Sequence, residues 1–207
     1  MIQAEVKEPP SGLRERSKAR RRAAIQRSAM RLFAERGYEN TTLDDVAADA
    51  DVARRTLAGY FPTKLSLASS FADELGERLA AAFQDRPDAD VIEVFDRWLS
   101  EEFEHLDPET VRLARDMYAA NPSLRALASA YATGAAQATR AGLLARMGLP
   151  DGDPLAAIAM SAFGAALTTY VFDILTLDAA SPELHDALMR FLTATLDAAK
   201  ELAPGRR

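Results

Sequence analysis

Apolar side chains recur at helical spacing along nearly the whole chain. The stretch 90–105 shows this most clearly, because one side of the expected helix is apolar and the other side is charged. Its apolar positions are Val91, Val94, Phe95, Trp98, Leu99 and Phe103. No run alternates apolar and polar residues for long enough to predict a half-buried strand. The sequence therefore predicts an all-α protein.

Several expected helices begin at a capping residue followed by proline. The capping side chain accepts hydrogen bonds from free amides of the first turn, and proline supplies a backbone angle already suited to a helix. The four pairs are Asp107-Pro108, Asn121-Pro122, Asp153-Pro154 and Ser181-Pro182. With breaks at residues 86–87 and 148–150, they predict about nine helices. We expect these helices at residues 14–36, 43–49, 53–60, 64–85, 90–105, 108–119, 122–147, 154–177 and 182–202.

The first three expected helices form a recognisable unit. The first helix ends at Gly37, a residue that commonly follows the last helical turn. Thr42 and Asp45 have the spacing of a capping box at the start of the second helix. A tight turn at residues 50–52 separates it from the third helix. Two short helices across a tight turn, behind a longer supporting helix, predict a helix-turn-helix.

Charge is distributed unevenly along the 207 residues. Residues 1–64 carry 13 Lys and Arg against 9 Asp and Glu, whereas residues 65–207 carry 12 against 22, so their net charges are +4 and −10. A basic N-terminal part on an acidic body favours a polyanionic partner such as nucleic acid. The alternative is a solvated N-terminal tail that happens to contain several arginines.

The residue types argue against catalysis and against a bound cofactor. The chain has no cysteine, and its two histidines, His105 and His185, are far apart in sequence, so thiol chemistry and a multi-histidine metal centre are not expected. No nucleophile–base pair, metal motif or phosphate-binding loop is present. We therefore expect a protein that is not an enzyme, with no cofactor and no metal.

Two segments bear on location. The first ten residues lack the apolar core of a signal peptide, so we expect a disordered arm on a cytoplasmic protein. The uncharged stretch 154–172 approaches the length of a membrane span. It is rich in small residues and has acidic flanks without basic anchors, so we expect a buried central helix and no membrane partner.

Residues 22–67 resemble the DNA-binding head of the tetracycline-repressor (TetR) family. The positions that carry the resemblance are Leu32-Phe33, Gly37-Tyr38, Thr41-Thr42, Val46-Ala47, Val52, Thr56-Leu57, Tyr60-Phe61, Thr63-Lys64 and Leu67. The chain departs from the family pattern at Asp51, Ala53 and Ala58, which stand where the family usually has the turn glycine, a capping hydroxyl and a tyrosine. These departures bear on DNA affinity.

The resemblance implies a disordered arm at 1–13, a helix-turn-helix DNA-binding domain at 14–63 and a ligand-binding and dimerisation domain at 64–207. It implies a ligand-responsive regulator, expected to be a repressor that binds a pseudo-palindromic duplex operator as a homodimer. A small, largely apolar or amphipathic effector would release it. The residues expected to contact DNA are Arg22, Thr42, Arg54, Arg55, Thr56, Tyr60 and Lys64.

Each DNA-contacting residue has an expected role. Arg54, Arg55 and Thr56 begin the recognition helix and can reach base edges or flanking phosphates, whereas Thr42, Tyr60 and Lys64 are placed for phosphates. The three arginines at 20–22 would add sequence-independent attraction. Alternatively, Tyr60 simply packs the head against the fourth helix.

The body is expected to hold the effector and the dimer interface. Expected ligand-binding residues are Phe95, Trp98, Leu99, Phe103, Met117, Tyr118, Tyr131, Phe163 and Tyr170, with Arg115, Thr168 and Thr169 as orienting polar groups. Expected interface residues are Gly164, Leu184, Leu188, Phe191, Leu192 and Thr195. Both sets have an alternative reading as internal core. Residues 121–126 resemble a stretch from a branch associated with acyl-coenzyme-A-like ligands.

A second function remains open at this stage. The departures at Ala53 and Ala58 are compatible with a helical small-molecule or lipid-binding protein whose head has weakened or lost DNA binding. Binding to DNA that flanks its own gene separates the two readings.

Overall fold

The computed structural model describes residues 11–124, 133–171 and 181–203, and all regular structure within these ranges is helical. The elements are α1 (Ser11–Arg36), α2 (Leu43–Asp49), α3 (Arg54–Tyr60), α4 (Lys64–Ala68), α5 (Ser70–Asp85), α6 (Val91–His105), α7 (Pro108–Ala120), α9 (Thr133–Met147), α10 (Pro154–Thr169) and α11 (Pro182–Leu202). The all-α prediction is confirmed for the described residues. The predicted arm at 1–13 lies mostly outside them, and α1 begins at Ser11.

The predicted capping residues begin three of the body helices. Asp107 accepts a hydrogen bond from the amide of Thr110, Asp153 accepts from Leu155, and Ser181 accepts from Leu184. In each case proline occupies the first turn, where its missing amide hydrogen leaves no partner unsatisfied. The chemistry of the cap therefore fixes where α7, α10 and α11 start.

The predicted helix at 64–85 is in fact two helices. The chain bends at Ser69, between α4 and α5, although Ser69 keeps helical backbone angles. The Ser70 hydroxyl donates to the Leu67 carbonyl oxygen at 2.8 Å. Serine hydroxyls that bond back to the preceding turn bend helices, and neither glycine nor proline signals the bend in the sequence.

Two other predicted helices extend beyond the part that the structure describes. Of the predicted helix 122–147, α9 begins at Thr133, and residues 125–132 lie outside the described ranges. Of 154–177, α10 ends at Thr169, and residues 172–180 lie outside them. The helix expected to be buried is buried on one face only, because Ala156, Ala159 and Phe163 of α10 are buried whereas Ile158 is 66% exposed.

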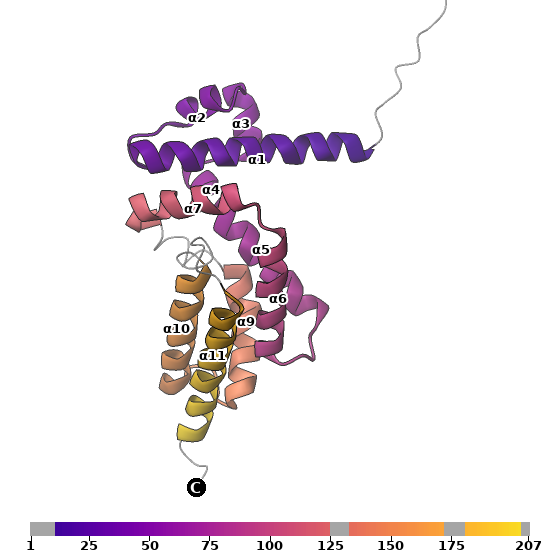
Figure 1. The fold of residues 1–207 in the computed structure, drawn as a ribbon, viewed down its shortest axis with the longest axis vertical. Coiled ribbons are helices and arrows are strands. Elements are labelled where there is room, and N and C mark those ends of the chain that lie inside the picture. Colours follow the sequence, from indigo (N-terminus) through magenta and orange to yellow (C-terminus); the bar gives the residue numbers. More distant parts are fainter. Residues whose placement is uncertain (1–10, 125–132, 172–180, 204–207) are drawn as a thin grey trace, which may run out of the picture.

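The head and the body each pack around aromatic side chains. In the head, Ile25 and Phe33 of α1 are fully buried together with Leu57 of α3. In the body, the ring of Phe95 on α6 lies 4.9 Å, centroid to centroid, from that of Phe163 on α10. Burying side chains of this size contributes roughly 1.5–3 kcal/mol each. α1 lies across one end of the molecule, with α2 and α3 on one side of it and α7 on the other (Figure 1).

Asn121, just after α7, fastens the body to the head. Its Nδ2 donates to the carbonyl oxygen of Phe33 at 2.9 Å and to that of Met117 at 2.8 Å. Its Oδ1 accepts from the amide of Tyr38 at 2.7 Å. One buried carboxamide thus satisfies groups at the C-terminal ends of both α1 and α7. The predicted capping role for the helix after Pro122 is replaced by this contact with the head.

Candidate nucleic-acid interface

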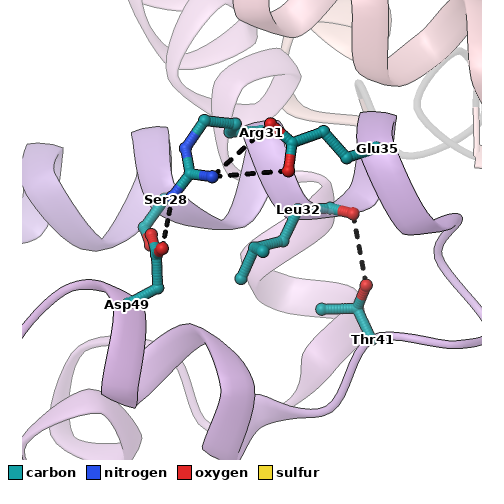
Figure 2. A network of polar contacts seen from close by, with 6 residues as sticks. All are labelled: Ser28, Arg31, Leu32, Glu35, Thr41 and Asp49. Atoms are coloured by element: carbon teal, nitrogen blue, oxygen red, sulfur yellow. Dashed lines mark hydrogen bonds and ion pairs between the residues drawn. The ribbon is translucent and has the colours of Figure 1, made fainter.

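Asp49, the last residue of α2, ties that helix to α1. Its carboxylate accepts hydrogen bonds from the Ser28 hydroxyl and from the Arg31 guanidinium, both on α1 (Figure 2). Arg31 also pairs with Glu35 at 3.4 Å. On the loop before α2, the buried hydroxyl of Thr41 donates to the carbonyl oxygen of Leu32 at 3.3 Å. These contacts fix the position of α2 on the supporting helix.

The hydrogen bond from Ser28, followed by that from Arg31, lowers the pKa of Asp49 below its usual value of 3.8. A carboxyl whose pKa is lowered by folding stabilises the fold above its usual pKa, and this contribution is lost as the pH falls through the folded value. Asp49→Asn is therefore expected to unfold at lower urea concentration than the native protein at neutral pH. The gap should narrow as the pH falls below 3.8.

Asp88→Asn, at an exposed aspartate in the loop before α6, is the matched control and should unfold like the native protein at every pH. A gap between Asp49→Asn and the native protein that stayed constant down to acid pH would contradict the link between this carboxylate and folding.

The turn between α2 and α3 has the backbone expected from the sequence. Asp51 has a φ of 51°, in the left-handed region that aspartate tolerates better than most residues. The amide of Val52 donates to the carbonyl oxygen of Ala47 at 2.9 Å and closes the turn. Ala53 occupies the cap of α3 and makes no side-chain hydrogen bond, as its methyl group requires. The missing cap costs about 1 kcal/mol.

α3 presents two arginines to solvent. Arg54 and Arg55 are exposed in its first turn, Thr56 is half-buried, and Leu57 is completely buried and anchors the helix in the head. The Nε of Arg54 lies 3.2 Å from Oδ1 of Asp44 on α2. Figure 1 shows α2 and α3 on the side of α1 that faces away from the body. Arginines in this place can form paired hydrogen bonds to guanine in the major groove.

The predicted phosphate-contacting residues are already engaged within the head. The hydroxyl of Thr42 donates to Asp45 Oδ2 at 2.6 Å and accepts from the Asp45 amide, which confirms the capping box and lowers the pKa of Asp45. The Nζ of Lys64 lies 4.2 Å from the ring centroid of Tyr38, in a cation–π contact. Tyr60 is half-buried. The Thr42 hydroxyl and the Lys64 ammonium therefore have intramolecular partners besides any phosphate.

Arg22 points toward the body rather than toward the turn. Its Nε donates to Glu74 Oε1 on α5 at 3.1 Å, and its guanidinium carbon lies 4.5 Å from the ring centroid of Phe61. The arginine thus bridges α1, the end of α3 and α5. Sequence reasoning found the basic residue and missed its partner, because 52 positions separate the two.

Most of the predicted ligand-binding side chains pack in the interior of the body. This holds for Phe95, Trp98, Leu99, Met117, Tyr118, Phe163 and Tyr170, all of which are buried. The side chain of Phe103 and all of Tyr131 lie outside what the structure describes. Of the polar candidates, Arg115 pairs with Asp116, Thr168 is half-buried and Thr169 is exposed.

A cleft of about 500 Å³ lies between α5, α6 and the start of α7, and Trp98 is the one predicted ligand residue on its wall. Arg78 and Glu102, also on its wall, form two hydrogen bonds of 2.6 and 2.9 Å. This pair raises the pKa of Arg78 and keeps the nearly buried Glu102 carboxylate compensated. Sequence reasoning missed the pair, because only the fold brings residues 24 positions apart together here.

The predicted dimer residues divide into two groups. Leu188 and Leu192 of α11 are buried within the chain itself, and Leu184 and Gly164 are half-buried. The ring of Phe191 is 53% exposed, and the nearby Thr195 hydroxyl donates to its carbonyl oxygen. Among the predicted interface residues, Phe191 exposes the largest apolar side chain to solvent.

The described residues contain neither a metal site nor a membrane-spanning helix. Within the described ranges, no group of three or more acidic or histidine side chains is arranged to hold a metal ion. Among the helices that the structure describes, none combines the length and apolar character needed to cross a membrane.

A short helix with exposed arginines, placed after a tight turn and packed on a longer supporting helix, is the arrangement of a helix-turn-helix. Residues 25–70 match the family described as bacterial regulatory proteins, tetR family. The matching segment contains the C-terminal half of α1, the helix-turn-helix and α4.

Two curated relatives match about a third of the chain. The HTH-type transcriptional regulator TcmR of Streptomyces glaucescens is 36% identical over 76 residues, which are 37% of this chain and 34% of that protein. The HTH-type transcriptional repressor Rv3405c of Mycobacterium tuberculosis is 38% identical over 71 residues, 34% of this chain and 38% of that protein. The chain thus matches little more than a third of the length of each of these relatives.

Two solved structures align with most of this chain at TM-scores below 0.5. One, from Mesorhizobium loti and assigned to the TetR family, is 19% identical with a TM-score of 0.48, covering 89% of this chain and 96% of that one. The other, RolR in complex with resorcinol, is 22% identical with a TM-score of 0.43, covering 92% and 96%.

Proposed function

We propose that the protein is a transcriptional regulator that binds duplex DNA through α3. The observation that carries the proposal is the pair of exposed arginines, Arg54 and Arg55, in the first turn of a helix anchored by the buried Leu57. Bidentate arginine–guanine contacts discriminate bases, and a rigid support preserves their geometry. Two relatives that match about a third of this chain are transcriptional regulators, which supports the same function.

A gel shift with DNA flanking the protein's own gene tests the proposal. Retarded DNA that persists in excess unrelated duplex is the expected result, because base contacts add to the sequence-independent phosphate term. Equal competition by any duplex, or no shift, would favour a helical ligand-binding protein with a vestigial head.

The regulator is proposed to act as a homodimer through α10 and α11. α10 contains no charged residue, and its exposed positions include Ala157, Ile158, Ser161, Ala162 and Ala165. Small residues allow two helices to approach closely, and Phe191 of the neighbouring α11 adds an exposed aromatic ring. A twofold dimer presents two recognition helices and therefore suits a pseudo-palindromic operator.

Phe191→Asp is expected to convert the dimer into monomers, because it places a charge in the apolar contact. Light scattering measures the mass. Ala119→Asp, at an exposed position on α7, is the matched control and should remain dimeric. If Phe191→Asp also kept the dimer mass, the interface would have to lie on another face.

Control by a small effector bound in the body is the remaining part of the proposal. The connections between body and head include the bent α4–α5 segment, the contact of α7 with α1 through Asn121 and the Arg22–Glu74 pair. An effector changes DNA affinity only if it binds the two arrangements of the heads unequally. Native mass spectrometry of protein purified from its own host identifies a retained effector by mass. A tightly retained compound that leaves operator affinity unchanged would contradict this role.

A further inference from the structure

The positive charge of the head lies almost entirely outside the helix-turn-helix. Residues 22–64 carry seven Lys and Arg against six Asp and Glu, a net charge of +1. Residues 11–21, the first three turns of α1, carry five against one, a net charge of +4. We name residues 11–21 the α1 extension.

Ion pairs engage three of the seven basic residues of this segment, two of them with its own carboxylates and one with a carboxylate of the body. Arg31 pairs with Asp49, and Arg54 pairs with Asp44. Arg22 is directed to Glu74 of the body. Much of the basic charge between residues 22 and 64 is thus already compensated, so that segment alone has little surplus with which to attract a polyanion.

The α1 extension is a solvent-exposed rod beside the recognition unit. Residues 12–21 are all exposed, and Figure 1 shows α1 continuing past α2 and α3. Eleven residues at 1.5 Å each give a length of about 16 Å. Duplex DNA carries one charge about every 1.7 Å along its axis, so this length corresponds to roughly nine phosphates.

Helical periodicity places the charges of the extension on opposite sides of α1. Arg21 precedes Ser28 by seven residues and Arg20 precedes Arg31 by eleven, which is close to two and three full turns. Ser28 and Arg31 both bond to Asp49 of α2. Arg20 and Arg21 therefore leave α1 on the side that carries the helix-turn-helix.

The one acidic residue of the extension lies on the other side. Glu15 precedes Arg22 by seven residues, and Arg22 reaches Glu74 of the body. Lys18 precedes Arg22 by four residues and shares this side. The extension thus directs Arg20 and Arg21 toward the DNA side and its only carboxylate toward the acidic body.

We infer that the α1 extension is a phosphate-binding arm that contacts the DNA backbone flanking the half-site read by α3. The inference rests on the proposed DNA-binding function and assigns to the extension most of the sequence-independent affinity. α3 selects the sequence, whereas the arm supplies the salt-sensitive attraction that holds the head on any duplex.

The test compares two charge-removal variants of the full chain. Arg20→Gln with Arg21→Gln removes two cations from the arm, and glutamine keeps a helix propensity close to that of arginine. Arg97→Gln with Arg112→Gln removes two exposed cations from the body as the matched control. Affinity for a random-sequence duplex is measured by fluorescence anisotropy at several salt concentrations, after circular dichroism has verified helix content.

Losing two phosphate contacts per protomer, and therefore four in the dimer, should make the plot of log affinity against log salt shallower by about 3.6. Between about 50 and 200 mM salt, this amounts to roughly a 100-fold smaller loss of affinity for the arm variant. The body variant should keep the native slope. Affinities for a specific operator and for random duplex should fall by similar factors in the arm variant.

Three outcomes would overturn the inference. The first is an unchanged slope in the arm variant while the native protein binds DNA. The second is a loss confined to one sequence, which would mean base readout. The third is unchanged DNA binding with lost binding to phosphatidylserine vesicles, which would make a membrane surface the partner. If the native protein bound no duplex at all, the proposed function itself would fail, which is distinguishable from all three.

Discussion

Replacing Asn121 with alanine is expected to lower the free energy of unfolding by about 2–4 kcal/mol. The substitution removes three hydrogen bonds from a buried site. The amide of Tyr38 and the carbonyl oxygen of Met117 lose this side-chain partner, whereas the carbonyl oxygen of Phe33 keeps the amide of Gly37 at 3.1 Å. Buried polar groups that lose their partners cost about 1–3 kcal/mol each before the surroundings relax. The large expected effect follows from the loss of three hydrogen bonds at one buried contact between the body and the head.

Urea unfolding followed by circular dichroism measures this effect. Asn40→Ala is the matched control, because Asn40 also caps the end of α1, donating to the Arg36 carbonyl oxygen at 3.0 Å, but it does so in solvent. An exposed cap of this kind should change stability by about 0.5 kcal/mol or less. Equal stabilities of the two variants would show that Asn121 does not fasten the head to the body.

Arg55→Ala is expected to weaken operator binding by about 5- to 150-fold, because a bidentate arginine–guanine contact contributes roughly 1–3 kcal/mol of discrimination. Its effect on random duplex should be much smaller. Ala58→Tyr should tighten both affinities by similar factors, since it adds a phosphate contact that carries no sequence information. Arg97→Ala, on the exposed side of α6, controls for the loss of one positive charge.

All affinities in this comparison are measured at one salt concentration, because the phosphate contribution varies steeply with salt. If Arg55→Ala lowered operator and random-duplex affinities equally, Arg55 would be a phosphate contact and base readout would have to reside in Arg54 and Thr56.

The helix-turn-helix could be predicted from the sequence because its signals are local. The capping box of Thr42 and Asp45 and the left-handed turn at Asp51 follow from side-chain chemistry within a few residues. The bend at Ser69 was missed, because serine hydroxyls bend a helix only when they turn back to bond the preceding turn.

The contacts between the head and the body could not be predicted. Asn121 reaches Tyr38 across 83 positions, and Arg22 reaches Glu74 across 52. Each of these side chains had a plausible local role: Asn121 as the cap of the helix that follows it, and Arg22 as a DNA contact. Which partner it takes depends on how α1 lies on α7 and α5, and this packing leaves no mark in the local sequence pattern.

The central claim is that this protein reads duplex DNA through α3 as a symmetric dimer. In vitro selection from a random duplex library with the purified protein tests it most directly. The account predicts enrichment of a motif with twofold symmetry, whose half-sites lie about one helical turn apart. It also predicts that Arg55→Ala enriches a motif degraded at the same position in both half-sites. Selection that enriches no motif, or a motif unaffected by the arginines of α3, would contradict the account.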